Sequence, residues 1–223
     1  MKKTLLLIPL VVGLSSSAWA GTCVSGTLAT YDMVGFSCML GDLTFSDFDY
    51  IPAASGGAIS PDAGGVTVTP LSGGPDTGLE FTAAWLVGPD QTIDSSISFD
   101  VSTTNPGGIT DAELSVVGAS AGTGSASVAE LSTSTNPNLN LFAYYALGTI
   151  KVPTDSATFA PVGSLSVFKD IGVSGGTAGV GHLSDVYELF SEGTTSTVPE
   201  PSLMILCAGL VGLVPVARRR FLR

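Results

Sequence analysis

The chain has very little positive charge between residues 21 and 197, where Lys151 and Lys169 are the only basic side chains and arginine is absent. Eighteen acidic residues share this segment, which gives it a formal net charge of −16. The whole chain carries only −11 because its other six bases lie near the two ends. Nucleic-acid binding depends on basic groups that neutralise phosphates. The composition therefore excludes a nucleic-acid-binding role for this segment.

Histidine and cysteine are also scarce, with one histidine and three cysteines in the chain. A lone His182 cannot build a zinc site without further ligands, so we predict no metal and no cofactor. Cys23 and Cys38 are the two cysteines of the segment 21–197, and we expect a disulfide between them in an oxidising compartment, with two free thiols as the alternative. Such a loop would stabilise the fold by roughly 3 kcal/mol. Cys207 falls in a later apolar run, where helix packing or lipidation would account for it.

The N-terminus has the pattern of a secretory signal peptide over residues 1–20. Lys2 and Lys3 precede an apolar core, and Ala18-Trp19-Ala20 provides a cleavage site of the A-x-A type. We therefore expect the general secretory machinery to export the chain and the mature protein to begin at Gly21. An uncleaved anchor is the alternative.

Residues 21–197 have the length of one domain and the pattern of short β-strands. Apolar and polar residues alternate with a period of two, and helical periodicity is not sustained. The predicted strands are residues 66–70, 79–85, 93–101, 112–117, 165–168 and 186–190. Residues 141–151 fit a strand or a short helix, and we favour the strand.

Glycine-rich turns such as 54–57, 105–108 and 174–176 separate the predicted strands. Many short strands joined by such turns are typical of an all-β fold. We predict a single antiparallel β-sandwich or jelly-roll-like domain, flanked by the signal peptide and a C-terminal transmembrane helix.

The C-terminal 26 residues, 198–223, have the pattern of a membrane-sorting tail. Residues 202–217 carry no charge and would form a helix of about 24 Å, slightly short of a ~30 Å hydrocarbon core. Arg218, Arg219 and Arg220 follow directly, and such clusters remain on the cytoplasmic side of the inner membrane. Taken alone, this pattern also fits an ordinary C-terminal anchor.

The residues Val198, Pro199, Glu200 and Pro201 precede the apolar run. Two prolines keep this motif extended and outside the helix. The motif, the short apolar helix and the arginine cluster together resemble the PEP-CTERM sorting tail of Gram-negative bacteria. The resemblance implies processing by an exosortase, with loss or exchange of the anchor, and an association with exopolysaccharide and biofilm.

The body has a resemblance of its own. Cys23 with residues 29–31, residues 38–42 and 43–48, and later 66–71 and 163–168 are similar to a group of secreted PEP-CTERM proteins of unknown function. This resemblance implies no activity.

One motif could indicate catalysis. Residues Gly118 to Gly122 match the G-x-S-x-G pattern of esterases around Ser120, with His182 later in the chain. That nucleophile needs a helix after it, whereas residues 123–127 are not helix-forming. Among 28 glycines a chance match arises easily. A Ser/His hydrolase is therefore our second alternative, and we predict that the protein is not an enzyme.

Two kinds of binding site remain as alternatives. Asp42, Asp47 and Asp49 have carboxylates at spacings that calcium ligands use, although they also fit the solvated face of a strand. Trp85 and the pair Tyr144-Tyr145 could bind sugar, although a core position suits Trp85 better. Our main prediction is an exported, non-enzymatic surface or matrix protein sorted by an exosortase, with a carbohydrate- or calcium-binding β-module as the first alternative.

Overall fold

The computed structural model describes residues 20–74, 76–132 and 137–194. Residues 1–19 of the predicted signal peptide, the sorting motif, the predicted transmembrane helix and the arginine cluster lie outside these residues. Within the part described, no helix is long and apolar enough to cross a membrane.

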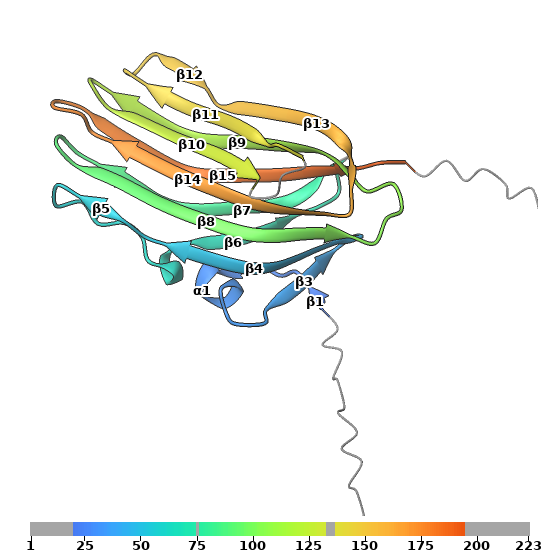
Figure 1. Ribbon diagram of the computed structural model, residues 1–223. Coiled ribbons are helices and arrows are strands. Elements are labelled where there is room, and N and C mark those ends of the chain that lie inside the picture. The colour runs from blue at the N-terminus through green and yellow to red at the C-terminus, as the bar shows by residue number, and fades with distance from the viewer. Residues whose placement is uncertain (1–19, 75, 133–136, 195–223) are drawn as a thin grey trace, which may run out of the picture.

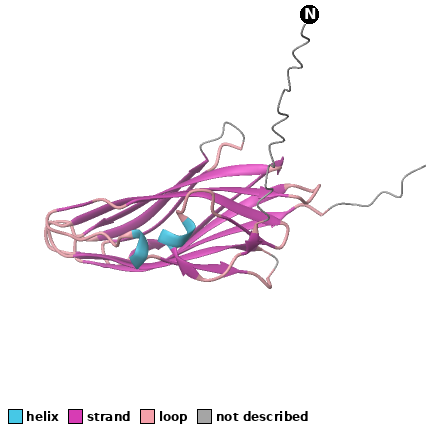
Figure 2. Ribbon diagram, turned by 90° about the horizontal axis from the view of Figure 1, so that it is seen from below, coloured by secondary structure: helices cyan, strands magenta, loops and turns pink. Residues whose placement is uncertain are grey.

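The described residues form two β-sheets packed face to face, as the strand pattern predicted (Figures 1 and 2). The nine-stranded sheet has the order β1-β3-β4-β8-β14-β10-β11-β12, and β5 pairs with β8 at its margin. Its strands are β1 (Gly21–Thr22), β3 (Ser37–Leu40), β4 (Leu43–Ile51), β5 (Ala54–Ser55), β8 (Thr92–Thr103), β10 (Ser125–Ser132), β11 (Asn140–Ala146), β12 (Ile150–Val152) and β14 (Ser164–Ser174). All neighbours run antiparallel except β1 and β3.

The six-stranded sheet has the order β13-β9-β15-β7-β6-β2. Its strands are β2 (Gly26–Thr27), β6 (Thr67–Leu71), β7 (Thr77–Val87), β9 (Ile109–Ala121), β13 (Thr154–Val162) and β15 (Val180–Glu192). The short helix α1 (Leu28–Tyr31) and the single turn η1 (Ala63–Gly65) lie together at one margin of the sandwich (Figure 2).

The core fills the space between the sheets because alternate residues of each strand point inward. Trp85 is 0% exposed, so it belongs to the core, as its place in an alternating strand suggested. Phe45, Phe99 and Phe190 form a cluster of rings from both sheets. The predicted disulfide joins Cys23 and Cys38, with 4.8 Å between their Cα atoms.

The six predicted strands all fall within or largely overlap observed strands. Residues 141–151 form a hairpin rather than one strand, because β11 ends at Ala146 and β12 begins at Ile150. The turn between them has positive φ at Leu147 (51°) and Gly148 (72°). Two consecutive residues in this conformation are typical of a tight hairpin turn, in which Gly148 meets no steric cost.

Candidate functional site

The outer face of the nine-stranded sheet carries a stacked pair of aromatic side chains on β11. The rings of Phe142 and Tyr144 have their centroids 5.3 Å apart and an interplanar angle of 30°. The two residues are two positions apart in a strand, so both point away from the core. Phe142 is 47% exposed. Large rings that remain accessible in this way are typical of binding surfaces.

Small and acidic residues continue this face across the neighbouring strands. Tyr144 pairs with Ser127 of β10, which pairs with Gly172 of β14. One row along the strands, Phe142 pairs with Ala129. Ala129 in turn pairs with Asp170 of β14.

At a strand spacing of about 4.8 Å, Asp170 lies roughly 10 Å from Phe142 along the row. We call the face formed by Phe142, Tyr144, Ser127, Ala129, Asp170, Gly172 and Asp94 the platform. The small residues Ser127, Ala129 and Gly172 lie between its aromatic side and its acidic side.

The acidic side of the platform consists of two carboxyl groups that interact. Asp94 of β8 pairs with Gly172, which makes it a diagonal neighbour of Asp170. Partial burial, followed by a hydrogen bond with Asp94 and its negative charge, raises the pKa of Asp170 above the usual 3.8. A carboxyl pair that holds a proton more tightly can donate as well as accept hydrogen bonds.

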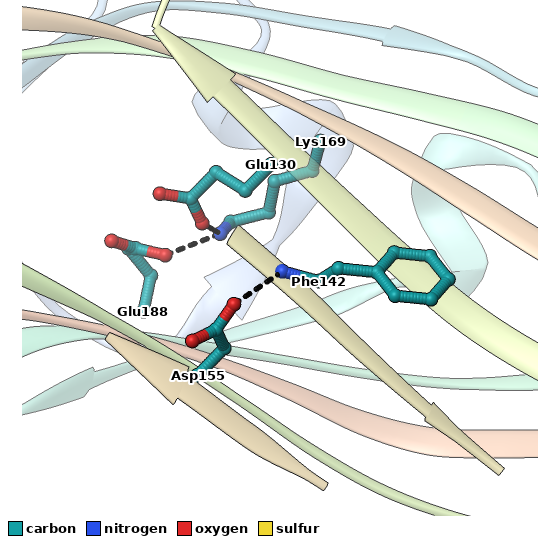
Figure 3. A network of polar contacts seen from close by, with 5 residues as sticks. All are labelled: Glu130, Phe142, Asp155, Lys169 and Glu188. Atoms are coloured by element: carbon teal, nitrogen blue, oxygen red, sulfur yellow. Dashed lines mark hydrogen bonds and ion pairs between the residues drawn. The ribbon is translucent and has the colours of Figure 1, made fainter. Parts of the chain in front are cut away.

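The backbone of the aromatic strand is held from the other sheet. The amide of Phe142 donates a hydrogen bond to Asp155 Oδ2 of β13 at 2.9 Å (Figure 3). Strand β12 pairs with β11 only from Tyr144 to Ala146, so it does not reach Phe142. The carboxylate therefore satisfies an amide at the margin of the sheet and fixes the position of the aromatic pair.

A groove of about 380 Å³ opens beside the same hairpin. Tyr145, Ser120, Gly148 and Lys151 are among its lining residues. Tyr145 donates through its hydroxyl to the Val116 carbonyl at 3.2 Å, and Ser120 Oγ accepts from the Gly148 amide at 3.0 Å. Tyr145 follows Tyr144 directly and points to the opposite side of β11, so the groove and the platform flank one strand.

Ser120 and His182 do not form a catalytic pair. Ser120 lies within strand β9, not at a turn from a strand into a helix. Its partner on the neighbouring strand is Gly181, whereas His182 pairs with Ala119. Directly paired residues share a face of a sheet, so Ser120 and His182 point to opposite faces. The esterase-like motif is thus a chance match in sequence.

The acidic cluster Asp42, Asp47 and Asp49 does not assemble a metal site. Among residues 20–74, 76–132 and 137–194, no group of three His, Cys, Asp or Glu side chains is placed to hold a metal ion. Asp47 has a φ of 53° at an irregularity in the pairing of β4 with β8. This irregularity lets Phe45 and Phe48, three positions apart, both face the core. Asp47 therefore has a structural explanation.

Three charged residues in the core were not predicted from the sequence. Lys169 of β14 contacts Glu130 of β10 and Glu188 of β15, and Figure 3 shows its ammonium group between the two carboxylates. All three residues are 0% exposed. The sequence signal was available: Lys169 occupies an apolar phase in β14, where Leu165, Val167, Ile171 and Val173 all point inward.

Comparison with known proteins identifies no family. No protein-family model matches the chain, and no curated protein matches it. Solved structures with a detectable likeness include TmCBM61 in complex with β-1,4-galactotriose (9% identity, 62% of this chain and 86% of that chain, TM-score 0.29). A family 11 carbohydrate-binding module from Clostridium thermocellum, in complex with a β-1,3-1,4-mixed-linked tetrasaccharide, has 12% identity over 78% of this chain and 100% of that chain, with a TM-score of 0.22.

The enzymatically active domain of bacteriophage CBA120 tailspike protein 4 has 12% identity over 63% of this chain, with a TM-score of 0.29. This chain spans 19% of the length of that tailspike structure. TM-scores this low carry no functional conclusion over to the present chain.

Proposed function

We propose that residues 21–197 are an exported, non-enzymatic module that binds neutral polysaccharide on the platform. The observation that carries this proposal is the stacked pair of exposed Phe142 and half-buried Tyr144, which faces the carboxyl pair Asp94–Asp170 across a row of small residues. Aromatic rings provide flat apolar area for the apolar faces of sugar rings. The carboxyl groups and Ser127 provide hydrogen-bond acceptors and donors for sugar hydroxyls.

The charge of the module decides which polysaccharides fit. Eighteen acidic residues against two bases give residues 21–197 a net charge of −16. Such a surface repels polyanions at moderate ionic strength. Neutral glycans therefore suit the platform better than glycans that are rich in uronic acids.

Delivery to the cell surface is the second part of the proposal. The signal peptide would direct export, and an exosortase would process the tail at Pro199-Glu200-Pro201 after transient anchoring in the inner membrane. The Cys23–Cys38 disulfide supports export, because structural disulfides persist in oxidising compartments. A polysaccharide-binding body would then hold the protein in an extracellular matrix.

Binding is tested by retardation in native gels that contain dextran, galactan, mixed-linkage glucan or alginate. At least one neutral polysaccharide should retard the wild type, and alginate should not. The Phe142→Ala/Tyr144→Ala variant should lose about 2 kcal/mol or more of binding free energy, roughly 30-fold in affinity, as truncated aromatic anchors do. Tyr187→Ala, on the outer face of the six-stranded sheet, is the matched control and should bind as the wild type does. Equal retardation of the double variant and the wild type would refute the platform.

Sorting is tested separately by the intact mass of the mature protein recovered from its native host. The proposal predicts loss of residues 1–20 and of the tail beyond the Pro-Glu-Pro motif. If the protein still carries Arg218 to Arg220, its tail is a plain membrane anchor and the exosortase assignment is wrong. The binding proposal does not depend on this outcome.

A further inference from the structure

The core triad Lys169, Glu130 and Glu188 joins the two sheets of the sandwich. Glu130 and Lys169 are directly paired across β10 and β14 of the nine-stranded sheet. Glu188 approaches from β15 of the six-stranded sheet, and Lys169 Nζ contacts the Oε2 atom of both glutamates. The amine thus lies between two carboxyl groups that belong to different layers.

The surroundings of the triad are apolar. In the nine-stranded sheet, Lys169 pairs on its other side with Ile97, and Glu130 pairs with Leu141. In the six-stranded sheet, Glu188 lies between Leu79 and Leu114. These four neighbours are at most 1% exposed. Each charge of the triad is therefore removed from solvent, which is costly even when the charges are paired.

The triad is incompletely satisfied as a set of ion pairs. The Oε1 atoms of Glu130 and Glu188 are both buried without a hydrogen-bond partner. Burial, and then the charge of Glu130, raises the pKa of Glu188 well above its usual range. Burial alone would lower the pKa of Lys169, but its interactions with Glu130 and Glu188 outweigh burial and raise that pKa. An ammonium, one carboxylate and one carboxylic acid make the triad neutral overall.

We propose that this triad is a self-modification site, at which Lys169 Nζ and Glu188 Cδ form an amide bond across the core. Glu188 supplies the acyl carbon, because an amine attacks a neutral carboxylic acid and not a carboxylate. Glu130 is the base that takes a proton from the ammonium and the acid that returns one. The proposal is independent of sugar binding, since it rests on the inner side of the sheet.

The reaction balances without any further reactant. A proton moves from Lys169 Nζ to the Glu130 carboxylate, which leaves a neutral amine. Nζ then forms a bond to Glu188 Cδ, and the bond from Cδ to the hydroxyl oxygen breaks as that oxygen leaves with a second proton from nitrogen, relayed by Glu130. The products are one secondary amide, protonated Glu130 and one water molecule. Total charge is zero before and after.

The fold provides what this reaction needs. Contact between the Lys169 ammonium and the Glu188 carboxyl group holds both reactants in one place and replaces a bimolecular encounter, an effect that reaches effective molarities of about 10⁵ M or more. Exclusion of solvent favours the neutral acid form of Glu188, which is the form that an amine attacks. The amide also removes buried charge that the ion pairs leave partly unsatisfied. The product would tie β14 to β15, and so one sheet to the other, by a bond that reducing agents do not break.

The test uses the full-length wild-type chain, reduced and denatured so that ion pairs dissociate. We first determine the two ends of the chain and calculate the mass expected between them. The measured mass should be about 18 Da lower than this calculated mass, a difference of one water molecule. Trypsin should cut after Lys151 but not after Lys169, because an acylated amine is not a trypsin site. Fragmentation should place the bond between residues 169 and 188. A mass equal to the calculated one, with cleavage after Lys169, would overturn the proposal, and an amide to Glu130 would overturn the roles assigned to the two glutamates.

Two matched variants assign the water loss. Lys151→Met replaces the other lysine of the body, which is exposed, and should retain the mass deficit. Lys169→Met should show no deficit. Glu130→Gln keeps the shape of the base but cannot accept the proton, so it should show no deficit or form the amide far more slowly. A deficit that persists in Lys169→Met would place the water loss elsewhere and overturn the assignment. Because the wild-type digest needs no variant, poor folding of a variant leaves the proposal testable.

Discussion

Strands β10 and β14 carry carboxyl groups on both faces of one sheet. The surroundings of these carboxyl groups differ between the outer and the inner face. On the outer face, Asp170 interacts with Asp94 in contact with solvent, and its pKa is raised by partial burial and by Asp94. On the inner face, Glu130 lies at 0% exposure beside Lys169, and Glu188 of the facing sheet contacts the same lysine, also at 0% exposure. We propose that the same functional group binds sugar where water reaches it and reacts where water is excluded.

The largest contrast is expected between the two lysines of the body. Lys169→Ala should destabilise the fold by about 3–5 kcal/mol, because it leaves two buried carboxyl groups without their cation. Lys151→Ala should change stability by no more than about 0.5 kcal/mol, as is usual for exposed positions. Urea unfolding with the disulfide intact measures both. A loss of under about 1 kcal/mol in Lys169→Ala would mean that the triad contributes little to the fold.

A pair of alanines on adjacent strands gives the next largest contrast. Ala143 of β11 is fully buried, so Ala143→Leu overfills the core and should cost about 1–3 kcal/mol. Ala129 of β10 faces outward on the platform, and Ala129→Leu should change stability by at most about 0.5 kcal/mol.

For polysaccharide binding, Ala129→Leu should have the larger effect of the two variants, because its leucine obstructs the platform and that of Ala143→Leu does not. The two variants are compared by unfolding and by gel retardation. Loss of binding in Ala143→Leu with full binding in Ala129→Leu would contradict the assignment of the two faces.

Sequence alternation predicted the all-β class and the core position of Trp85, because inward and outward residues of a strand follow from its period of two. β4 confirms that Asp47 and Asp49 belong to a strand, which was the alternative to a calcium site, whereas the irregularity near Asp47 that shifts the phase between Phe45 and Phe48 was not predicted. The G-x-S-x-G match carries no information on the site, because a motif records neighbours along the chain, whereas the sheet decides which face each residue occupies. Pairing of Ser120 with Gly181 and of His182 with Ala119 is set by the register alone.

The triad was missed for a related reason, and of the platform only Tyr144 was named from the sequence as a candidate for sugar binding. Glu130, Lys169 and Glu188 are separated by 39 and 19 residues, and only the strand order brings them together. In the sequence, each of the three residues nevertheless occupies a position at which the alternation of its strand has apolar residues. The stacked pair Phe142–Tyr144 lay in a segment that fits a strand or a helix, and its exposure depends on β11 pairing with a short β12.

The smallest expected effect is the pH dependence that Asp170 contributes. Its folded pKa lies above the unfolded value of about 3.8, so its contribution to stability is present below that value and is lost as pH rises through the folded pKa. Asp170→Asn lacks this loss, so its stability relative to the wild type should increase slightly over that range. Ser98→Ala, on the same face and without a titrating group, should show no such trend. Unfolding midpoints measured across the acidic range check the sign.

The most direct test of the functional account is the backbone amide NMR spectrum of the protein during titration with a neutral oligosaccharide taken from a polysaccharide that retards it. The account predicts shifts that cluster on the platform, at residues 127–129, 142–144 and 170–172, with Tyr187 and Glu80 on the other outer face unchanged. Shifts confined to the six-stranded sheet, or to the groove beside Ser120 and Lys151 with the platform unaffected, would contradict it.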